Sequence, residues 1–273
     1  GTGNTGVVGS TIRPLAGRKA PATGDIVIAP GVVLSARGLW VNDAGAGAEA
    51  LLGPAFTNGG SISLETRQSV VFSESSGAGC AGQQQSCVID STGSILLGEG
   101  SVLDVSSGGR VLPDGRLATR DGVVQGRGGN LSLLTYAVGD AQFGGSDRLP
   151  LPDAAPRAGR IELGGTILSH GFSGGGTFAI RTLGLRIGEP SPTEGAGTLQ
   201  LAPAWFEGQG FANYRFVAEY DALITQDSIL RPVQWSLLPD LAALRQLGSG
   251  TDLYAASRAA PELLRIGPQD DFR

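Results

Sequence analysis

The stretch GGSISLET, residues 59–66, recurs with substitutions as GGNLSLLT at 128–135 and as GGTFAIRT at 175–182. Each copy begins with two glycines, alternates apolar and polar residues, and ends on threonine. An alternation with a period of two is typical of a β-strand that buries one of its faces. The recurrence therefore predicts three short strands at equivalent places of a repeating fold.

One face of each predicted strand carries the apolar residues of the repeat. The side chains expected to point inward are Ile62, Leu64, Leu131, Leu133, Phe178 and Ile180. The paired glycines that precede them predict sharp turns with positive φ, a conformation that other residues avoid. Strands this short cannot bury a face alone, so each copy is expected to pack against the next.

A second motif precedes each copy of the first. It reads GDIVIAPGVVLS from Gly24, GSILLGEGSVLD from Gly93 and GRIELGGTILS from Gly159, so its starts lie 69 and 66 residues apart. The Gly-Gly copy follows 35 residues later in the first two cycles and 16 residues later in the third. These spacings predict inserted segments near 40–57, 75–88, 107–127 and 136–158.

Short strands, glycine corners and a fixed repeat together predict an all-β fold whose coils stack into a parallel β-helix. This repeat region is expected to span 1–238. The tail, 239–273, differs in character, because PDLAALRQLG from Pro239 has leucines at helical spacing, with a start signal at Asp240 and a glycine stop at Gly248. We therefore expect one short helix in the tail.

The composition excludes several classes of protein. The 273 residues include 45 Gly and 15 Pro, which favours a turn-dense fold. The net charge is −5 and Lys19 is the only lysine, so no basic patch exists for a nucleic acid. No apolar run approaches the roughly 18 residues of a membrane-spanning helix. The lack of methionine predicts a piece of a longer protein, with any export signal outside it.

The two cysteines, Cys80 and Cys87, lie in CAGQQQSC within a stretch rich in Gly, Ser and Gln. Two thiols without a second pair do not favour a structural zinc site. We expect a local disulfide that closes a short loop, which would suit an exported protein because such bonds persist in oxidising compartments. Free or buried thiols are the alternative.

Motifs associated with catalysis or cofactors occur in unsuitable contexts. GTGNTG at 1–6 has no preceding strand, which a dinucleotide-binding turn requires. GFSGG at 171–175 places Ser173 between two predicted strands, whereas a nucleophile elbow needs a strand-to-helix turn and a later histidine. His170, the only histidine, precedes it. The sequence predicts a Ser/Gly corner there, and no catalytic, cofactor-binding or metal site.

Acidic pairs could still support glycan cleavage, because β-helices also host polysaccharide lyases and hydrolases. Asp104 with Glu99, and Asp270 with Asp271, are the clearest local pairs, but neither recurs at the spacing of the cycles. We expect lone outward carboxylates on a solvated wall. PDGR at 113–116 predicts a β-turn, and Asn130, which opens a glycosylation sequon, is expected as an outward polar residue.

The alternation of GSILLGEGSVLDVSSGG with GGNLSLLT resembles the repeats of filamentous-haemagglutinin-like exoproteins. The resemblance covers about 24–235 and includes WFEGQGFANYRFVAEYDALITQDSIL at 205–230, which is similar to a stretch in a subgroup of that family. It implies a right-handed β-helical shaft in a bacterial virulence protein that is secreted or held at the cell surface. It also implies two-partner secretion through an outer-membrane transporter.

The expected function is therefore attachment. We expect a non-catalytic shaft and binding-surface segment of a large adhesin that contacts a glycan or protein receptor on host cells or other surfaces. Contacts are expected from the inserts, with Trp40, Phe56, Tyr136 and Phe143 as their aromatic residues. A β-helical carbohydrate-active enzyme, or the stalk of a contact-dependent growth inhibition toxin, are the alternatives.

Overall fold

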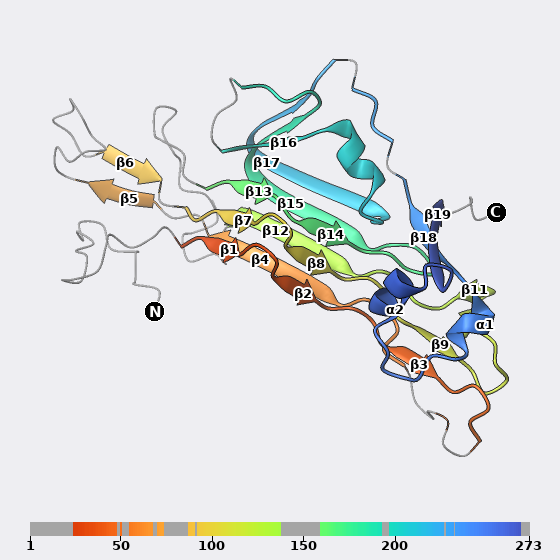
Figure 1. The fold of residues 1–273 in the computed structure, drawn as a ribbon. Helices are drawn as coiled ribbons and strands as arrows, with labels where there is room; N and C mark the ends of the chain where they lie inside the picture. Colours follow the sequence, from red (N-terminus) through yellow and green to blue (C-terminus); the bar gives the residue numbers. More distant parts are fainter. Residues whose placement is uncertain are drawn as a thin grey trace, which may run out of the picture.

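The computed structural model of the chain is mainly β, with parallel sheets and two short α-helices, which confirms the predicted class (Figure 1). Corresponding strands of successive cycles lie side by side along an elongated body. The structure describes residues 24–47, 50, 55–67, 70–73, 87–90, 92–137, 159–192, 197–226, 228–231 and 233–268.

Three parallel sheets each take one strand from every cycle. The first sheet joins β1 (Ile26–Ile28), β7 (Ile95–Leu97) and β13 (Ile161–Leu163). The second joins β2 (Val33–Ser35), β8 (Val102–Asp104) and β14 (Thr166–Leu168). The third joins β4 (Ser61–Arg67), β12 (Asn130–Ala137) and β15 (Thr177–Ile187).

The register of these sheets follows the sequence repeat. Ile95 of β7 pairs with Ile26 on one side and with Ile161 on the other, as the 69- and 66-residue spacings require. In the third sheet, Leu131 of β12 pairs with Ile62 and with Phe178. Residues that the two motifs align are therefore neighbours across the parallel ladders.

The third sheet continues past the third cycle. β17 (Asn213–Ile224) pairs in parallel with β15 along its whole length, and β16 (Thr198–Leu201) pairs with the second half of β15. The 3₁₀-helix η1 (Pro203–Glu207) lies between them in the sequence. β17 is thus the last strand of this sheet at the end opposite to β4.

The paired glycines are needed for close packing of the backbone. The prediction that they adopt positive φ was wrong. None of the six has a positive φ. A Cβ on Gly59 would instead lie 1.8 Å from the carbonyl oxygen of Val105, and one on Gly129 would lie 1.8 Å from that of Gly60. Backbone passes backbone too closely there for any side chain, since Gly129 N donates to Val105 O at 2.7 Å.

The predicted inward side chains form the main core. Leu131, Leu133, Phe178 and Ile180 are fully buried, whereas Ile62 and Leu64 pack on the same cluster but stay half-buried. The difference arises because β4 is the first strand of its sheet and is covered on one side only. At the other end the core is closed by aromatic rings around Phe178, those of Trp205, Phe206, Phe211, Tyr214 and Phe216.

Two of the predicted inserts begin as regular structure. β3 (Trp40–Asn42) pairs in parallel with β9 (Gly109–Val111), so Trp40 is buried at 2% exposure and is not part of a free loop. Tyr136 is also buried, and its hydroxyl accepts from Gly159 N at 3.1 Å. Both residues stabilise the fold, which corrects their expected role as contact residues, whereas Phe56 is 77% exposed.

One short antiparallel pair lies within the predicted insert 107–127, and another joins the strands at either end of the predicted insert 75–88. β10 (Thr119–Arg120) pairs with β11 (Val123–Val124), and β5 (Val70–Ser73) pairs with β6 (Cys87–Asp90). The predicted PDGR turn is confirmed, because Gly115 N donates to Leu112 O, with φ +77° at Gly115. Phe143 and most of 136–158 lie outside the described residues.

In the structure the tail begins at Trp235, four residues before the predicted boundary, and contains a hairpin and two helices. β18 (Trp235–Pro239) pairs antiparallel with β19 (Leu264–Pro268). The predicted helix is α1 (Leu241–Leu244), which Asp240 caps by accepting from Ala242 N and Ala243 N. A second helix, α2 (Leu253–Ala259), was not predicted. Neither of these helices is long enough to cross a membrane, and the described residues contain no other α-helix.

Candidate functional site

The most elaborate group of polar contacts among the described residues lies where the tail meets the repeat region. Both sides of this seam also contribute apolar side chains to a second buried cluster. The repeat region supplies Trp40, Val111 and Phe172, and the tail supplies Leu237, Leu244, Leu253, Leu263 and Leu264. Burial of these apolar side chains stabilises the packing of the tail on the repeat region.

The polar contacts begin at the corner that follows β2, β8 and β14. Because Ser35 pairs with Asp104, and Asp104 with Leu168, the residues two places further on also correspond. They are Arg37, Ser106 and His170. Gly38 N donates to Ser106 O at 3.0 Å and Ser107 N to His170 O at 2.8 Å, so the ladder continues through this corner.

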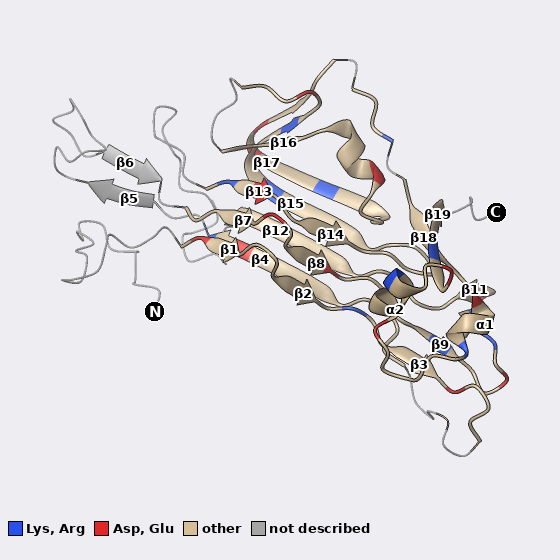
Figure 2. Ribbon diagram, in the orientation of Figure 1, with Lys and Arg blue, Asp and Glu red and all other residues tan. Residues whose placement is uncertain are grey.

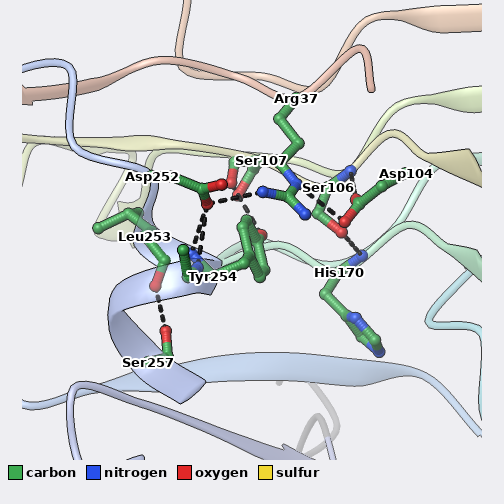
Figure 3. A network of polar contacts seen from close by, with 10 residues as sticks. Arg37, Asp104, Ser106, Ser107, His170, Asp252, Leu253, Tyr254 and Ser257 are labelled. Atoms are coloured by element: carbon green, nitrogen blue, oxygen red, sulfur yellow. Dashed lines mark hydrogen bonds and ion pairs between the residues drawn. The ribbon is translucent and has the colours of Figure 1, made fainter. Parts of the chain in front are cut away.

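Arg37 joins two carboxylates from distant parts of the chain (Figure 3). Its Nε lies 2.8 Å from Asp104 Oδ2 and its Nη1 lies 2.6 Å from Asp252 Oδ1. The guanidinium also lies over the Tyr254 ring, 4.7 Å from the centroid. Burial acts to lower the pKa of Arg37, but the two carboxylates outweigh it and the pKa is raised.

Asp104 is wholly buried, so the expectation of an outward carboxylate was wrong for this residue. Its second oxygen accepts from Ser106 N at 2.8 Å. A buried carboxylate needs both a countercharge and hydrogen bonds, and Arg37 and the Ser106 amide supply them. Glu99 lies exposed on the turn before β8, away from this contact set.

Asp252 has a second role as the N-cap of α2. Its Oδ1 accepts from Tyr254 N at 3.0 Å and from Ala255 N at 3.1 Å. Burial acts to raise the pKa of Asp252, while the amides and Arg37 lower it by more, so the net shift is downward. The same carboxylate therefore starts the helix and ties it to Arg37.

Tyr254 is deeply placed between the tail and the repeat region. Its hydroxyl donates to Ser107 O at 2.8 Å, and burial raises its pKa well above the usual range. The phenol is thus a neutral hydrogen-bond donor throughout the physiological pH range. Ser257 Oγ donates to Leu253 O within the same helix.

His170 points its ring away from the guanidinium in Figure 3. Its backbone N donates to Ser106 Oγ at 3.1 Å. Burial lowers the pKa of His170, more than Asp104 and a hydrogen bond with the Gly208 backbone raise it. The following GFSGG forms a turn that leads into strand β15 and not into a helix, which confirms the predicted corner.

The seam contains a small hollow of about 160 Å³, lined by Ser35, residues 37–40, Ser107 and residues 250–254. Sites for drug-sized ligands measure about 300–1,000 Å³. Beside this hollow, Arg37 pairs with both Asp104 and Asp252, so one positive charge faces two negative charges. Both oxygens of Asp104 accept hydrogen bonds, one from Arg37 and one from Ser106 N. The arrangement can lock the tail in place.

Two further ion pairs link neighbouring cycles. Arg110 Nη2 lies 2.8 Å from Asp43 Oδ2, and Arg181 Nε lies 2.6 Å from Glu219 Oε1. Figure 2 shows that basic and acidic residues are interspersed along the sheets. Within the described ranges no three His, Cys, Asp or Glu side chains are grouped as a metal site would require.

Several residues singled out in the sequence lie outside the described residues or away from the seam. Cys80, Asp270 and Asp271 lie outside the described residues, and for Cys87 only the strand β6 is described, so the disulfide stays a prediction. Asn130 is exposed as expected, but its Oδ1 accepts from Thr177 N at 2.8 Å. The carboxamide is therefore part of the contact between β12 and β15.

Sequence reasoning missed Arg37, Asp252 and Tyr254. A local signal did exist for Asp252, because Asp before a run of helix-forming residues is an N-cap pattern. The pairing of Arg37 with Asp252 spans 215 positions and has no counterpart in the local sequence.

Comparisons with protein-family models, with curated proteins and with solved structures find no match to this chain.

Proposed function

We propose that this chain is a non-catalytic segment of a right-handed parallel β-helical shaft in a large secreted bacterial adhesin. In this proposal an outer-membrane transporter exports the full-length protein. The shaft presents binding surface to a glycan or protein receptor on host cells or other surfaces. The observation that supports it best is the common register of the three cycles in three separate parallel sheets.

That register is the pattern expected of stacked coils. If every cycle adds one strand to each sheet, each coil lengthens the shaft by the usual inter-strand distance, about 4.8 Å. Inserts can then vary in length at the corners without disturbing the ladders. The third cycle supports this, since it reaches β15 after 16 residues where the others need 35.

The acidic residues of the repeat region also favour a structural role. Asp104, Asp43 and Glu219 have side chains no more than 8% exposed, and each contacts an arginine of a neighbouring cycle or strand. Glycoside hydrolysis needs two carboxyl groups roughly 5–10 Å apart across a substrate groove. Carboxylates committed to arginines between cycles stabilise a shaft and are unsuited to that chemistry.

Two exposed regions are the best candidates for receptor contact. Leu39 and Phe56 are exposed side by side, because Leu39 N donates to Phe56 O at 2.8 Å. The second region is the pair of turns at 113–122, where Asp114 and Arg116 lie at one tip and Arg120 at the next. Exposed loop tips on a rigid scaffold are common recognition sites.

The test uses the 273-residue chain on cultured epithelial cells and on arrays of pectins, alginates and glycosaminoglycans. We expect binding without depolymerisation. Either Leu39→Ser with Phe56→Ser, or replacement of 113–122 by a Gly-Ser linker, should weaken binding about tenfold or more. Leu238→Ser with Ile266→Ser is the matched control, since both residues are exposed on the tail hairpin.

Three results would contradict the proposal. Binding that is lost in the control but kept in both variants would place the surface on the tail. Depolymerisation abolished by one acidic substitution would favour a carbohydrate-active enzyme. A chain that binds no cell or glycan, while its parent protein inhibits neighbouring bacteria, would favour a toxin stalk.

A further inference from the structure

β17 has one edge without a strand partner in the described part of the chain. Its other edge pairs with β15 from Asn213 to Ile224. A twelve-residue edge strand presents a row of backbone N–H and C=O groups that can pair with another strand. Folded proteins usually cover or pair such an edge, which raises the question of what covers β17.

The two halves of β17 differ in how far they are covered. In the first half, Tyr214, Phe216 and Ala218 pack against the core cluster and the rings of η1. In the second half every residue from Tyr220 to Ile224 is exposed, including Tyr220 at 61% and Ile224 at 58%. A partner strand that runs antiparallel would place its own covered half beside this bare half.

The charges on the outer face of β17 are complementary under such an arrangement. Paired residues of two parallel strands point to the same face of the sheet, and successive residues of one strand point to opposite faces. Arg215 pairs with Ala179, whose neighbours Phe178 and Ile180 are buried, so Arg215 points outward. Ala222 pairs with the buried Leu185, so the preceding residue, Asp221, also points outward. Arg215 and Asp221 therefore lie on the same outer face. Neither forms an ion pair with another described residue, in contrast to Glu219, which Arg181 holds at 2.6 Å.

We propose that β17 pairs antiparallel with β17 of a second copy, with the two-fold axis at Ala218. This register sets Arg215 opposite the partner's Asp221, and the reverse, so two ion pairs form per dimer. It also sets Phe216 opposite the partner's Tyr220, which is a favourable cross-strand aromatic pair. An axis at Val217 would instead set Arg215 against Glu219, which is already engaged by Arg181.

A two-fold dimer of this kind uses the same strand from both copies. Symmetry requires antiparallel pairing, and many sheets that are otherwise parallel carry an antiparallel strand at their edge. The exposed apolar residues at 220–224 would then lie beside the partner's η1 and Phe216. The dimer thus covers both the unpaired edge and the bare half of β17.

Sedimentation velocity of the 273-residue chain between about 1 and 200 μM tests the proposal. We expect a reversible dimer. Arg215→Glu and Asp221→Arg should each raise the dimer dissociation constant about tenfold or more, because attraction becomes repulsion at two sites. The double charge swap should restore it to within about threefold. Arg265→Glu, an exposed charge on β19, is the matched control and should leave the dissociation constant unchanged.

Disulfide trapping tests the register. In a Cys80→Ser, Cys87→Ser background, Ala218→Cys should cross-link two copies on oxidation. Val217→Cys should not, because residues offset by two positions lie about 7–8 Å apart across the pair. A chain that is monomeric at every concentration overturns the proposal. A dimer whose dissociation constant is unchanged by the charge reversals, or one that cross-links through Val217→Cys instead, also overturns it. None of these results bears on receptor binding.

Discussion

The hydrogen bonds that stabilise the repeat region differ in kind from those that attach the tail to it. Within the repeat region, parallel backbone ladders join equivalent strands in one register, so the same contact recurs from cycle to cycle. The tail is attached mainly by side chains that reach single backbone groups, such as Arg245 Nε donating to Gly115 O and Tyr254 OH donating to Ser107 O.

This difference shows which part of the molecule could be extended and which could not. A further cycle could join the ladders by repeating bonds that already exist, because its backbone needs only the same register. The tail instead contacts individual residues of the repeat region that have no equivalent in the other cycles, such as Trp40, Ser107 and Phe172. Substitutions should therefore affect the two regions by different mechanisms.

The largest effect is expected where two backbones touch inside the repeat region. Gly129→Ala would place a Cβ 1.8 Å from Gly60 O, and that atom cannot move without breaking the ladder. We expect a loss of about 3 kcal/mol or more in the free energy of unfolding, measured by urea denaturation. Gly248→Ala in the tail is the control, because its Cβ meets nothing within 4 Å. Equal losses would contradict the packing argument.

The next effect should come from the seam between the regions. Arg37→Ala would leave the buried Asp104 without its countercharge, and we expect a loss of about 3 kcal/mol. Arg116→Ala removes the ion pair with Asp114, which measures 3.4 Å, is exposed and should contribute nothing measurable. Urea denaturation of both variants makes the comparison. A small loss for Arg37→Ala would show that the tail is held by its apolar cluster alone.

A third comparison lies within the repeat region. Leu133 and Leu64 occupy the same place in the Gly-Gly motif, but Leu133 is fully buried while Leu64 is half-buried at the end of its sheet. We expect Leu133→Ala to cost about 3 kcal/mol and Leu64→Ala about 1 kcal/mol. Thermal and urea unfolding would measure the difference. Similar losses would mean that the first cycle is covered as well as the second.

The smallest effect concerns pH. The folded-state pKa of His170 lies below its ordinary value of 6.5, so the neutral form is favoured in the folded protein. The contribution of neutral His170 to the free energy of unfolding is complete above about pH 6.5, and it is lost as the pH falls through the lowered pKa. We expect a decrease of less than about 1 kcal/mol between pH 7.5 and 5.5. His170→Asn should remove this slope, and an unchanged slope would exclude His170, the only histidine, as its source.

The sequence determined the strand register and one helix, because both depend on local patterns. The alternation around Leu131 and the recurrence after 69 residues specify which residues face inward and which residues become neighbours. Asp240 followed by leucines at helical spacing specified α1 in the same way. Each of these signals lies within about ten residues or repeats at a fixed interval.

Only the tertiary structure decided what the corners contact. The glycine pairs proved necessary for a close approach between backbones, which involves residues as distant as Gly59 and Val105. Asp104 and Trp40, expected at the surface, are buried because the tail and the neighbouring cycle cover them. Arg37 meets Asp252 across 215 positions. Burial and charge pairing over such separations depend on the path of the whole chain, and no local pattern of residues encodes that path.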